Sequence, residues 1–297
     1  QLADFLGEEQ SDAVRWFETH KRSFTLSRTP LDIAGEFSKF HQGSGAAWIF
    51  TSATLSVNHD FGHFARSLGL SAAAAQSWES PFDYRSQSML YVPQDMPDPT
   101  DRTINYTAEV VNAAVPVLKA SRGRAFMLFT SRAALQTAAE LLPKFVDYPL
   151  FVQGSQPKAA LLEAFKQAGD GVLLGTASFW EGVDVRGDAL SCVIIDKLPF
   201  ASPGDPVLSA RMDAMKRQGV SPFNAYQLPA AVIALRQGAG RLIRSNEDRG
   251  ILMLCDPRLL SKPYGKAFLD SLPPMKRTRL LYRVEEFFQV ERDGVGA

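Results

Sequence analysis

GVLLGTASFWEGVDVRGDALSCVIID, residues 171–196, is the stretch that decides the fold class. It holds two short apolar runs, and each run is followed by a turn or a polar side chain. Similar runs recur along the chain: Ala47–Thr51, Ser88–Val92, Ala125–Phe129, Leu150–Gln153, Gly171–Gly175, Ser191–Asp196 and Gly250–Cys255. Short apolar runs of this kind are typical of strands that are buried on both faces of a parallel sheet.

Helical spacing fills several of the intervals between these runs. The segments are Tyr106–Ala120, Arg132–Leu142, Pro157–Ala168 and Pro229–Arg244. Strands that alternate with helices of this length predict an α/β fold, with a mainly parallel sheet and helices on both of its faces.

Composition limits the classes of protein that this chain can belong to. Lysine plus arginine and aspartate plus glutamate both count 32, so no overall field attracts nucleic acid and any such contact must be local. No apolar stretch approaches the roughly 20 residues that cross a bilayer. Cys192 and Cys255 each lie in an apolar run, which favours buried thiols in a reducing compartment. We therefore expect a globular cytoplasmic protein.

Domain boundaries are less sharply marked. Residues 1–45 do not follow the strand–helix pattern and read as the tail of a preceding region, and the start at Gln1 rather than Met favours the removal of sequence upstream. Residues 46–274 form the predicted main domain. Residues 275–297 form a predicted C-terminal amphipathic helix and tail.

The strongest chemical signal is a glutamine and two arginines near the end of the last predicted helix. Each helical residue advances by about 100°, so Gln237, Arg241 and Arg244 share one narrow face. Guanidinium groups bind phosphate oxygens in bidentate fashion, which suits a triphosphate, and Arg244 is the candidate for stabilising charge during phosphoryl transfer. The alternative is a helix end whose arginines favour the negative pole of the helix dipole.

A second signal is the loop from Gly175 to Asp184, which follows a predicted strand. Its hydroxyl residues Thr176 and Ser178 suit contacts with a nucleic-acid backbone. Trp180 suits stacking on a base, or alternatively a place in the core. Glu181 and Asp184 suit holding an arginine or a ribose hydroxyl, or alternatively ordinary turn and capping chemistry.

Hydroxyl residues also follow two other strands. Thr51-Ser-Ala-Thr-Leu55 is one such turn, and the second contains Thr130 and Ser131. Both suit phosphate contacts, although Ser and Thr are also common helix caps. The chain has no G-x-x-x-x-G-K-[ST] phosphate loop and no H-E-x-x-H motif. It therefore carries arginines for a nucleotide that it does not bind alone.

Taken in order, these segments resemble motifs III to VI of superfamily 2 helicases. The segments are Thr51–Leu55, the turn at Thr130 and Ser131, Gly175–Asp184, Asp196–Phe200 and Gln237–Arg244. Their Trp-Glu-Gly-Val-Asp and Gln-Gly-Ala-Gly-Arg-Leu-Ile-Arg forms resemble the XPD/DinG type of DNA helicase, and within it the bacterial YoaA branch. The resemblance covers about Thr29 to Pro274 and implies a RecA-like second motor lobe of the P-loop NTPase type.

The resemblance also implies cofactors and site residues. ATP and magnesium would be bound between two lobes, and the other lobe would supply the phosphate loop and an iron–sulfur cluster, for which this chain has too few cysteines. Gln237, Arg241 and Arg244 would reach the phosphates, with Glu181 and Asp184 coupling that site to DNA. The residues along single-stranded DNA would be Thr130, Ser131, Thr176, Ser178 and Trp180. This chain alone is expected to be inactive as an ATP hydrolase.

The C-terminal stretch supports a competing class, a docking module. Apolar residues recur at helical spacing after a basic start, and cations at a helix N-terminus oppose the dipole and favour an acidic partner. The residues in question are Lys276, Arg277, Thr278, Arg279, Leu281, Phe287 and Phe288. The resemblance implies the chi subunit of the DNA polymerase III clamp loader as a candidate partner. The alternative is a helix that packs on its own domain.

Overall fold

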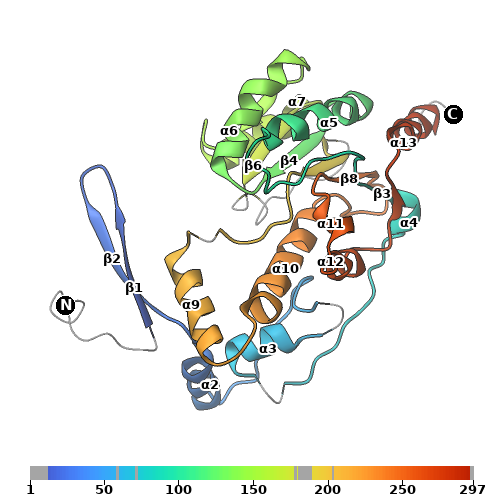
Figure 1. Cartoon of the computed structure of the whole chain (residues 1–297). Helices are drawn as coiled ribbons and strands as arrows, with labels where there is room; N and C mark the ends of the chain where they lie inside the picture. Colours follow the sequence, from blue (N-terminus) through green and yellow to red (C-terminus); the bar gives the residue numbers. More distant parts are fainter. Residues whose placement is uncertain are drawn as a thin grey trace. The chain divides into compact units, whose positions relative to one another are not determined.

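The computed structural model describes residues 13–57, 60–70, 73–176, 179, 189–202 and 204–294. The chain forms two compact units (Figure 1). The first unit combines the chain up to Trp78 with Phe200–Ile233, and the second combines Glu79–Pro199 with the chain from Ala234 onward. Each unit joins segments that are far apart in the sequence, and the predicted boundaries at residues 45 and 274 stay predictions.

A seven-stranded sheet forms the centre of the second unit, with the strand order β5-β6-β4-β7-β8-β3-β9. The strands are β3 (Ser88–Tyr91), β4 (Ala125–Phe129), β5 (Leu150–Val152), β6 (Val172–Thr176), β7 (Cys192–Ile195), β8 (Gly250–Leu254) and β9 (Lys276–Thr278). All six neighbouring pairs are parallel. The predicted α/β class and parallel sheet are confirmed.

One predicted strand is wrong. Ala47–Thr51 has no regular secondary structure, and Ile49 is 86% exposed. An apolar run forms a strand only beside a hydrogen-bonded neighbour, and no strand in the described part of the chain pairs with this one.

The helices of the second unit include the predicted crossovers. They are α4 (Tyr84–Gln87), α5 (Tyr106–Ser121), α6 (Arg132–Leu141), the 3₁₀ turn Leu142–Lys144, α7 (Lys158–Ala168), α11 (Arg258–Ser261), α12 (Gly265–Ser271) and α13 (Leu281–Gly294). Helix α10 (Leu228–Ala239) crosses the division between the units. Among the described helices, none is long and apolar enough to cross a membrane.

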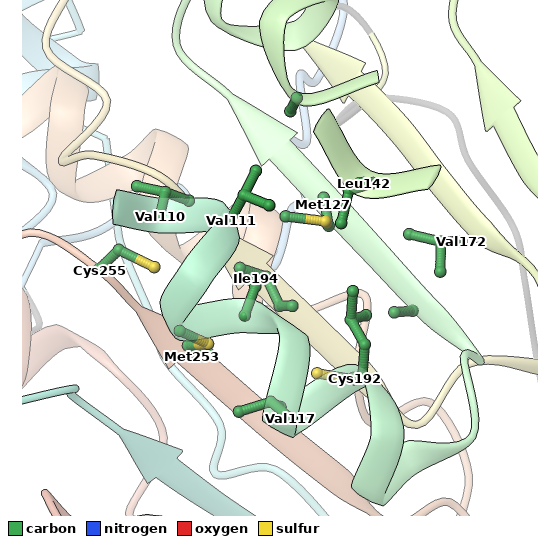
Figure 2. Close-up of a cluster of buried hydrophobic side chains, with 14 of the residues drawn as sticks. Val110, Val111, Val117, Met127, Leu142, Val172, Cys192, Ile194, Met253 and Cys255 are labelled. Atoms are coloured by element: carbon green, nitrogen blue, oxygen red, sulfur yellow. The ribbon is translucent and has the colours of Figure 1, made fainter. Parts of the chain in front are cut away.

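The core of the second unit lies on both faces of the sheet. On one face, alternate strand residues form a buried cluster with α5, α6 and α13. Figure 2 shows Val110, Val111 and Val117 of α5 with Met127, Ile194 and Met253 of the strands. On the other face, the intervening residues Phe126 and Leu128 are also fully buried. Burial of both faces explains why these strands have continuous apolar sequences.

The first unit contains an antiparallel hairpin that the sequence analysis missed. Its strands are β1 (Ala13–Thr19) and β2 (Phe24–Pro30). The remaining elements are α2 (Ala34–Gly43), α3 (Gly62–Leu68), α9 (Pro206–Arg217) and the π-helix Phe223–Gln227. Phe37, Trp48 and Phe50 of this unit form aromatic contacts, although Trp48 is 38% exposed.

Candidate functional site

Four polar residues lie in a row at one edge of the sheet. Gln153 follows β5, Thr176 ends β6, Thr130 follows β4 and Asp196 follows β7. The four strands are parallel and adjacent in that order, so their carboxyl ends meet at the same edge. This edge is where ligands gather in open parallel sheets.

Asp196 holds the turn that contains Thr130. Its Oδ1 accepts hydrogen bonds from the backbone N–H groups of Thr130 (2.9 Å) and Lys197 (2.7 Å). Its Oδ2 accepts a bond from the Thr130 hydroxyl (3.2 Å). The turn then leads into α6, where the exposed Ser131 accepts a bond from the N–H of Ala134 as the helix cap.

The environment of Asp196 is unusual for a carboxyl group, because only 2% of the residue is exposed. Burial raises its pKa to about 7, although Lys197 and the hydrogen bonds from Thr130 oppose the increase. The Tyr106 hydroxyl donates to the carbonyl oxygens of Asp196 (3.0 Å) and Cys255 (2.9 Å), which joins the ends of β7 and β8. Burial also raises the pKa of Tyr106, so this phenol keeps its proton.

Gln153 holds Thr176 in a similar way. Its Oε1 accepts bonds from the N–H (2.6 Å) and the hydroxyl (3.0 Å) of Thr176. A single side-chain oxygen on the neighbouring strand thus fixes the start of the predicted loop after β6.

The predicted arginines lie beyond a helix rather than on one. Helix α10 ends at Ala239, so only Gln237 is helical, and the prediction that it shares a helical face with Arg241 and Arg244 is wrong. The helix ends because the last turn tightens: the N–H of Arg241 donates to the carbonyl oxygen of Gly238 at 3.2 Å. Arg241 and Arg244 therefore belong to the loop that connects α10 to β8.

The backbone of this arginine loop, residues 240–249, is held by hydrogen bonds from two side chains, one in the loop and one outside it. Asp248, of which 8% is exposed, accepts bonds through Oδ2 from the N–H groups of Arg244 (2.7 Å) and Ser245 (2.8 Å). The Gln87 side-chain amide donates to the carbonyl oxygens of Ser245 and Asp248, both at 2.9 Å. The backbone on both sides of Arg244 is thus held in one conformation.

The threonines and the arginine loop occupy opposite ends of the strands. Gln87 directly precedes β3 and the arginine loop runs into β8, and these strands pair in parallel with Ser88 opposite Gly250. The arginine loop therefore lies at the amino end of the sheet, whereas Thr130 and Thr176 lie at the carboxyl end. Gly250 allows the close approach here, since a Cβ atom would lie 2.5 Å from the Ser191 carbonyl oxygen.

Four predicted site residues lie outside the described residues. They are Ser178, Trp180, Glu181 and Asp184. Their roles remain predictions.

The predicted partner-binding segment is only partly a helix. Lys276, Arg277 and Thr278 form β9 at the edge of the sheet, so the argument from cations at a helix N-terminus does not apply. Helix α13 packs on α5, and Phe287 and Phe288 are 8% and 1% exposed. These two phenylalanines are core residues, because an apolar helical face gains more from its own domain than from water.

The cysteines do not fit an iron–sulfur cluster. Cys192 in β7 and Cys255 after β8 are both buried in the core, and burial raises the pKa of each thiol. A cluster needs four thiolate ligands or their equivalent. Within the described ranges, no group of three or more potential ligands could hold a metal ion.

Comparison with known families gives a clear result. Residues 114–275 match the family described as Helicase C-terminal domain. The chain belongs to this family. It is 46% identical over 275 residues to ATP-dependent DNA helicase YoaA of Escherichia coli (strain K12), and 34% identical over 279 residues to ATP-dependent helicase DinG of Mycobacterium tuberculosis (strain ATCC 25177 / H37Ra). The resemblance to the XPD/DinG type and its YoaA branch is confirmed.

These alignments cover most of this helicase chain but less than half of the relatives. The E. coli YoaA alignment spans 93% of the chain and 43% of the relative, and the DinG alignment spans 91% and 41%. Among solved structures, an XPD helicase matches 90% of the chain with a TM-score of 0.63 at 15% identity, and S. tokodaii Xpd4 matches 85% with 0.57 at 15% identity. The structural matches confirm the RecA-like lobe.

The sequence analysis assigned no role to the residues that hold the site in place, although Asp196 begins one of the helicase-like segments. Asp196 and Gln153 each stand directly after a buried strand, and that position is a usable signal. Asp248 and Gln87 gave no comparable signal, because they come together only when β3 pairs with β8, and they are 161 positions apart.

Proposed function

We propose that this chain is the C-terminal motor lobe of an ATP-dependent DNA helicase that moves along single-stranded DNA in replication or repair. One observation carries the proposal: a chain of this helicase family has a fixed arginine loop at one end of its sheet and a row of held polar turns at the other. A motor lobe needs both a nucleotide contact and a DNA contact, and it needs a rigid connection between them.

The nucleotide side is the arginine loop. Gln237, Arg241 and Arg244 would contact the ATP phosphates, and the Arg244 guanidinium would stabilise the charge that develops during hydrolysis. Asp248 supports this role, because it fixes the backbone from which Arg244 extends. The phosphate loop and the magnesium ligands would come from another lobe, so this chain alone would not hydrolyse ATP.

The DNA side is the carboxyl edge of the sheet. The turn after β4 and the loop after β6, with Ser178 and Trp180, would follow one strand by backbone contact and stacking rather than by sequence readout. Glu181 and Asp184 would couple this edge to the nucleotide site. Net charge is zero, so binding would depend on these local contacts.

Single-strand-stimulated ATP hydrolysis tests the proposal. We expect no hydrolysis by this chain, and hydrolysis by a protein that joins it to a lobe with a phosphate loop. In that longer protein, Arg244→Ala should lower turnover by about 10³-fold or more while ATP binding is retained. Arg217→Ala is the matched control, since Arg217 is an exposed arginine of α9. Hydrolysis by this chain alone, or full turnover in the Arg244 variant, would overturn the proposal.

A docking role remains a second candidate because β9 is an edge strand with exposed basic residues. Lys276, Arg277 and Arg279 are all exposed. They suit an acidic replication protein, such as the polymerase III chi subunit that the resemblance implies. Charge reversal in Lys276→Glu with Arg279→Glu should abolish binding of chi while DNA binding is unchanged. Unchanged binding of chi would exclude this surface.

A further inference from the structure

The hydrogen bonds of Thr130 bear on whether this residue can contact DNA directly. Threonine has two hydrogen-bond donors, the backbone N–H and the hydroxyl. In Thr130 both donate to Asp196, at 2.9 Å and 3.2 Å. A hydroxyl that donates its hydrogen to the side-chain oxygen of Asp196 has none left for a phosphate oxygen, which only accepts. The observed contacts therefore fix the turn at Thr130 in place and leave its hydroxyl no hydrogen for DNA.

The same arrangement recurs at the end of β6, the strand next to β4. Both donors of Thr176 bond to the side-chain oxygen of Gln153, at 2.6 Å and 3.0 Å. Asp196 comes from β7 and Gln153 from β5, so the two anchoring side chains come from opposite sides of the β6–β4 pair. Two independent occurrences on adjacent strand ends indicate a shared way of fixing these turns.

Asp196 is well placed to act as the fixed point. It is buried, and its own carbonyl oxygen accepts a bond from Tyr106, which also bonds the end of β8. Its Oδ1 additionally holds the N–H of Lys197 at 2.7 Å. The Lys197 ammonium nitrogen lies 5.2 Å from the centre of the Tyr106 ring, a distance at which a cation is attracted to an aromatic face.

We infer that Asp196 is a positioning residue, which holds Thr130 as an anchor and orients Ser131 and Lys197 as the groups that meet the DNA backbone. This inference rests on the proposed function. Ser131 is exposed, and in the described part of the chain its hydroxyl only accepts a bond, from Ala134. Asp196 holds Lys197 through its backbone N–H, and the half-buried Lys197 side chain carries the positive charge over the Tyr106 ring.

Binding of a labelled oligothymidylate at several salt concentrations tests which residues contact DNA. Lys197→Gln should weaken binding about fivefold at 0.1 M salt and reduce the salt slope by about 0.7, the values for one phosphate contact. Thr130→Val should lower the unfolding midpoint because Asp196 loses a donor, and its affinity should fall less than that of Lys197→Gln. Thr130→Ser is the matched control, since it keeps the hydroxyl. A larger loss of affinity in Thr130→Val, without a change in stability, would overturn the inference.

Amide hydrogen exchange tests the positioning role without DNA. The N–H groups of Thr130 and Lys197 should be protected in the unaltered chain, should exchange at least tenfold faster in Asp196→Ala, and should regain protection in Asp196→Asn. Asparagine restores protection because its side-chain oxygen accepts the same two bonds. Equal protection in all three proteins would refute the role of Asp196. Failure of the unaltered chain to bind DNA would instead refute the proposed function, and the exchange result would still decide the role of Asp196.

Discussion

Replacing Asp196 with asparagine should remove a pH dependence from the stability of the second unit. Burial raises the folded-state pKa of this carboxyl from its ordinary value of 3.8 to about 7. Between these two values the folded chain holds a proton that the unfolded chain has released, so the free energy of unfolding falls as pH rises. Asparagine cannot ionise and keeps the same acceptor for Thr130 and Lys197.

The magnitude follows from the width of this window. One pKa unit corresponds to about 1.4 kcal/mol, and the folded group is already half ionised at pH 7, so the free energy of unfolding should fall by about 2 kcal/mol between pH 5 and pH 7. Above pH 7 the effect should level off. The groups around Asp196 are Lys197, Tyr106, Cys255 and the Asp256–Arg258 ion pair, and all of them are unchanged in the variant.

Urea unfolding of both proteins at pH 5, 6, 7 and 8, followed by far-UV circular dichroism, measures this difference. Other titrating groups affect both proteins equally and cancel in the subtraction. The variant should become more stable relative to the unaltered chain as pH rises, by about 3 kcal/mol across the series. A difference that stays constant within about 1 kcal/mol would show that Asp196 ionises normally in the folded state, and the argument from burial would be wrong.

Three further substitutions test the packing around the sites, each by its urea midpoint. Asp248→Ala should cost about 2 to 3 kcal/mol, because the N–H groups of Arg244 and Ser245 lose a charged acceptor, whereas the exposed neighbour Glu247→Ala should cost little. Gly250→Ala should cost about 1 to 3 kcal/mol, since its Cβ would lie 2.5 Å from the Ser191 carbonyl oxygen; an unchanged midpoint would mean that β8 shifts freely. Phe288→Ala should cost about 3 to 5 kcal/mol by leaving a cavity against α5, with the exposed Glu285→Ala as control; a neutral result would place α13 away from the core.

The sequence allowed much of the second unit to be predicted because local patterns determine it. Five apolar residues in a row predict β4, and the helical spacing of α5, α6 and α7 places these helices within one or two residues of their observed bounds. The resemblance of the motifs to those of superfamily 2 helicases predicted in addition that the domain is a RecA-like lobe. Both conclusions depend on short segments that can be interpreted without their neighbours.

Other features depend on contacts that a linear pattern does not contain. The end of α10 at Ala239 is an example, since apolar residues continue through Leu242 and Ile243, which are buried although they are not helical. The apolar Ala47–Thr51 segment shows the opposite case, in which strand-like residues have no strand beside them in the described part of the chain. The partners of Asp196 and Gln153 followed only from the order of the strands, although the position of each residue after an apolar run could be seen in the sequence.

The position of β3 in the sheet has a consequence for synthesis on the ribosome. Its two neighbours, β8 and β9, are translated long after it, and the Gln87–Asp248 bond beside it joins residues 161 positions apart. Strands β4 to β7 can pair as they emerge, whereas β3 must wait unpaired until β8 is made. An exposed apolar strand is a site for aggregation, so this segment is where a nascent chain would most need a chaperone.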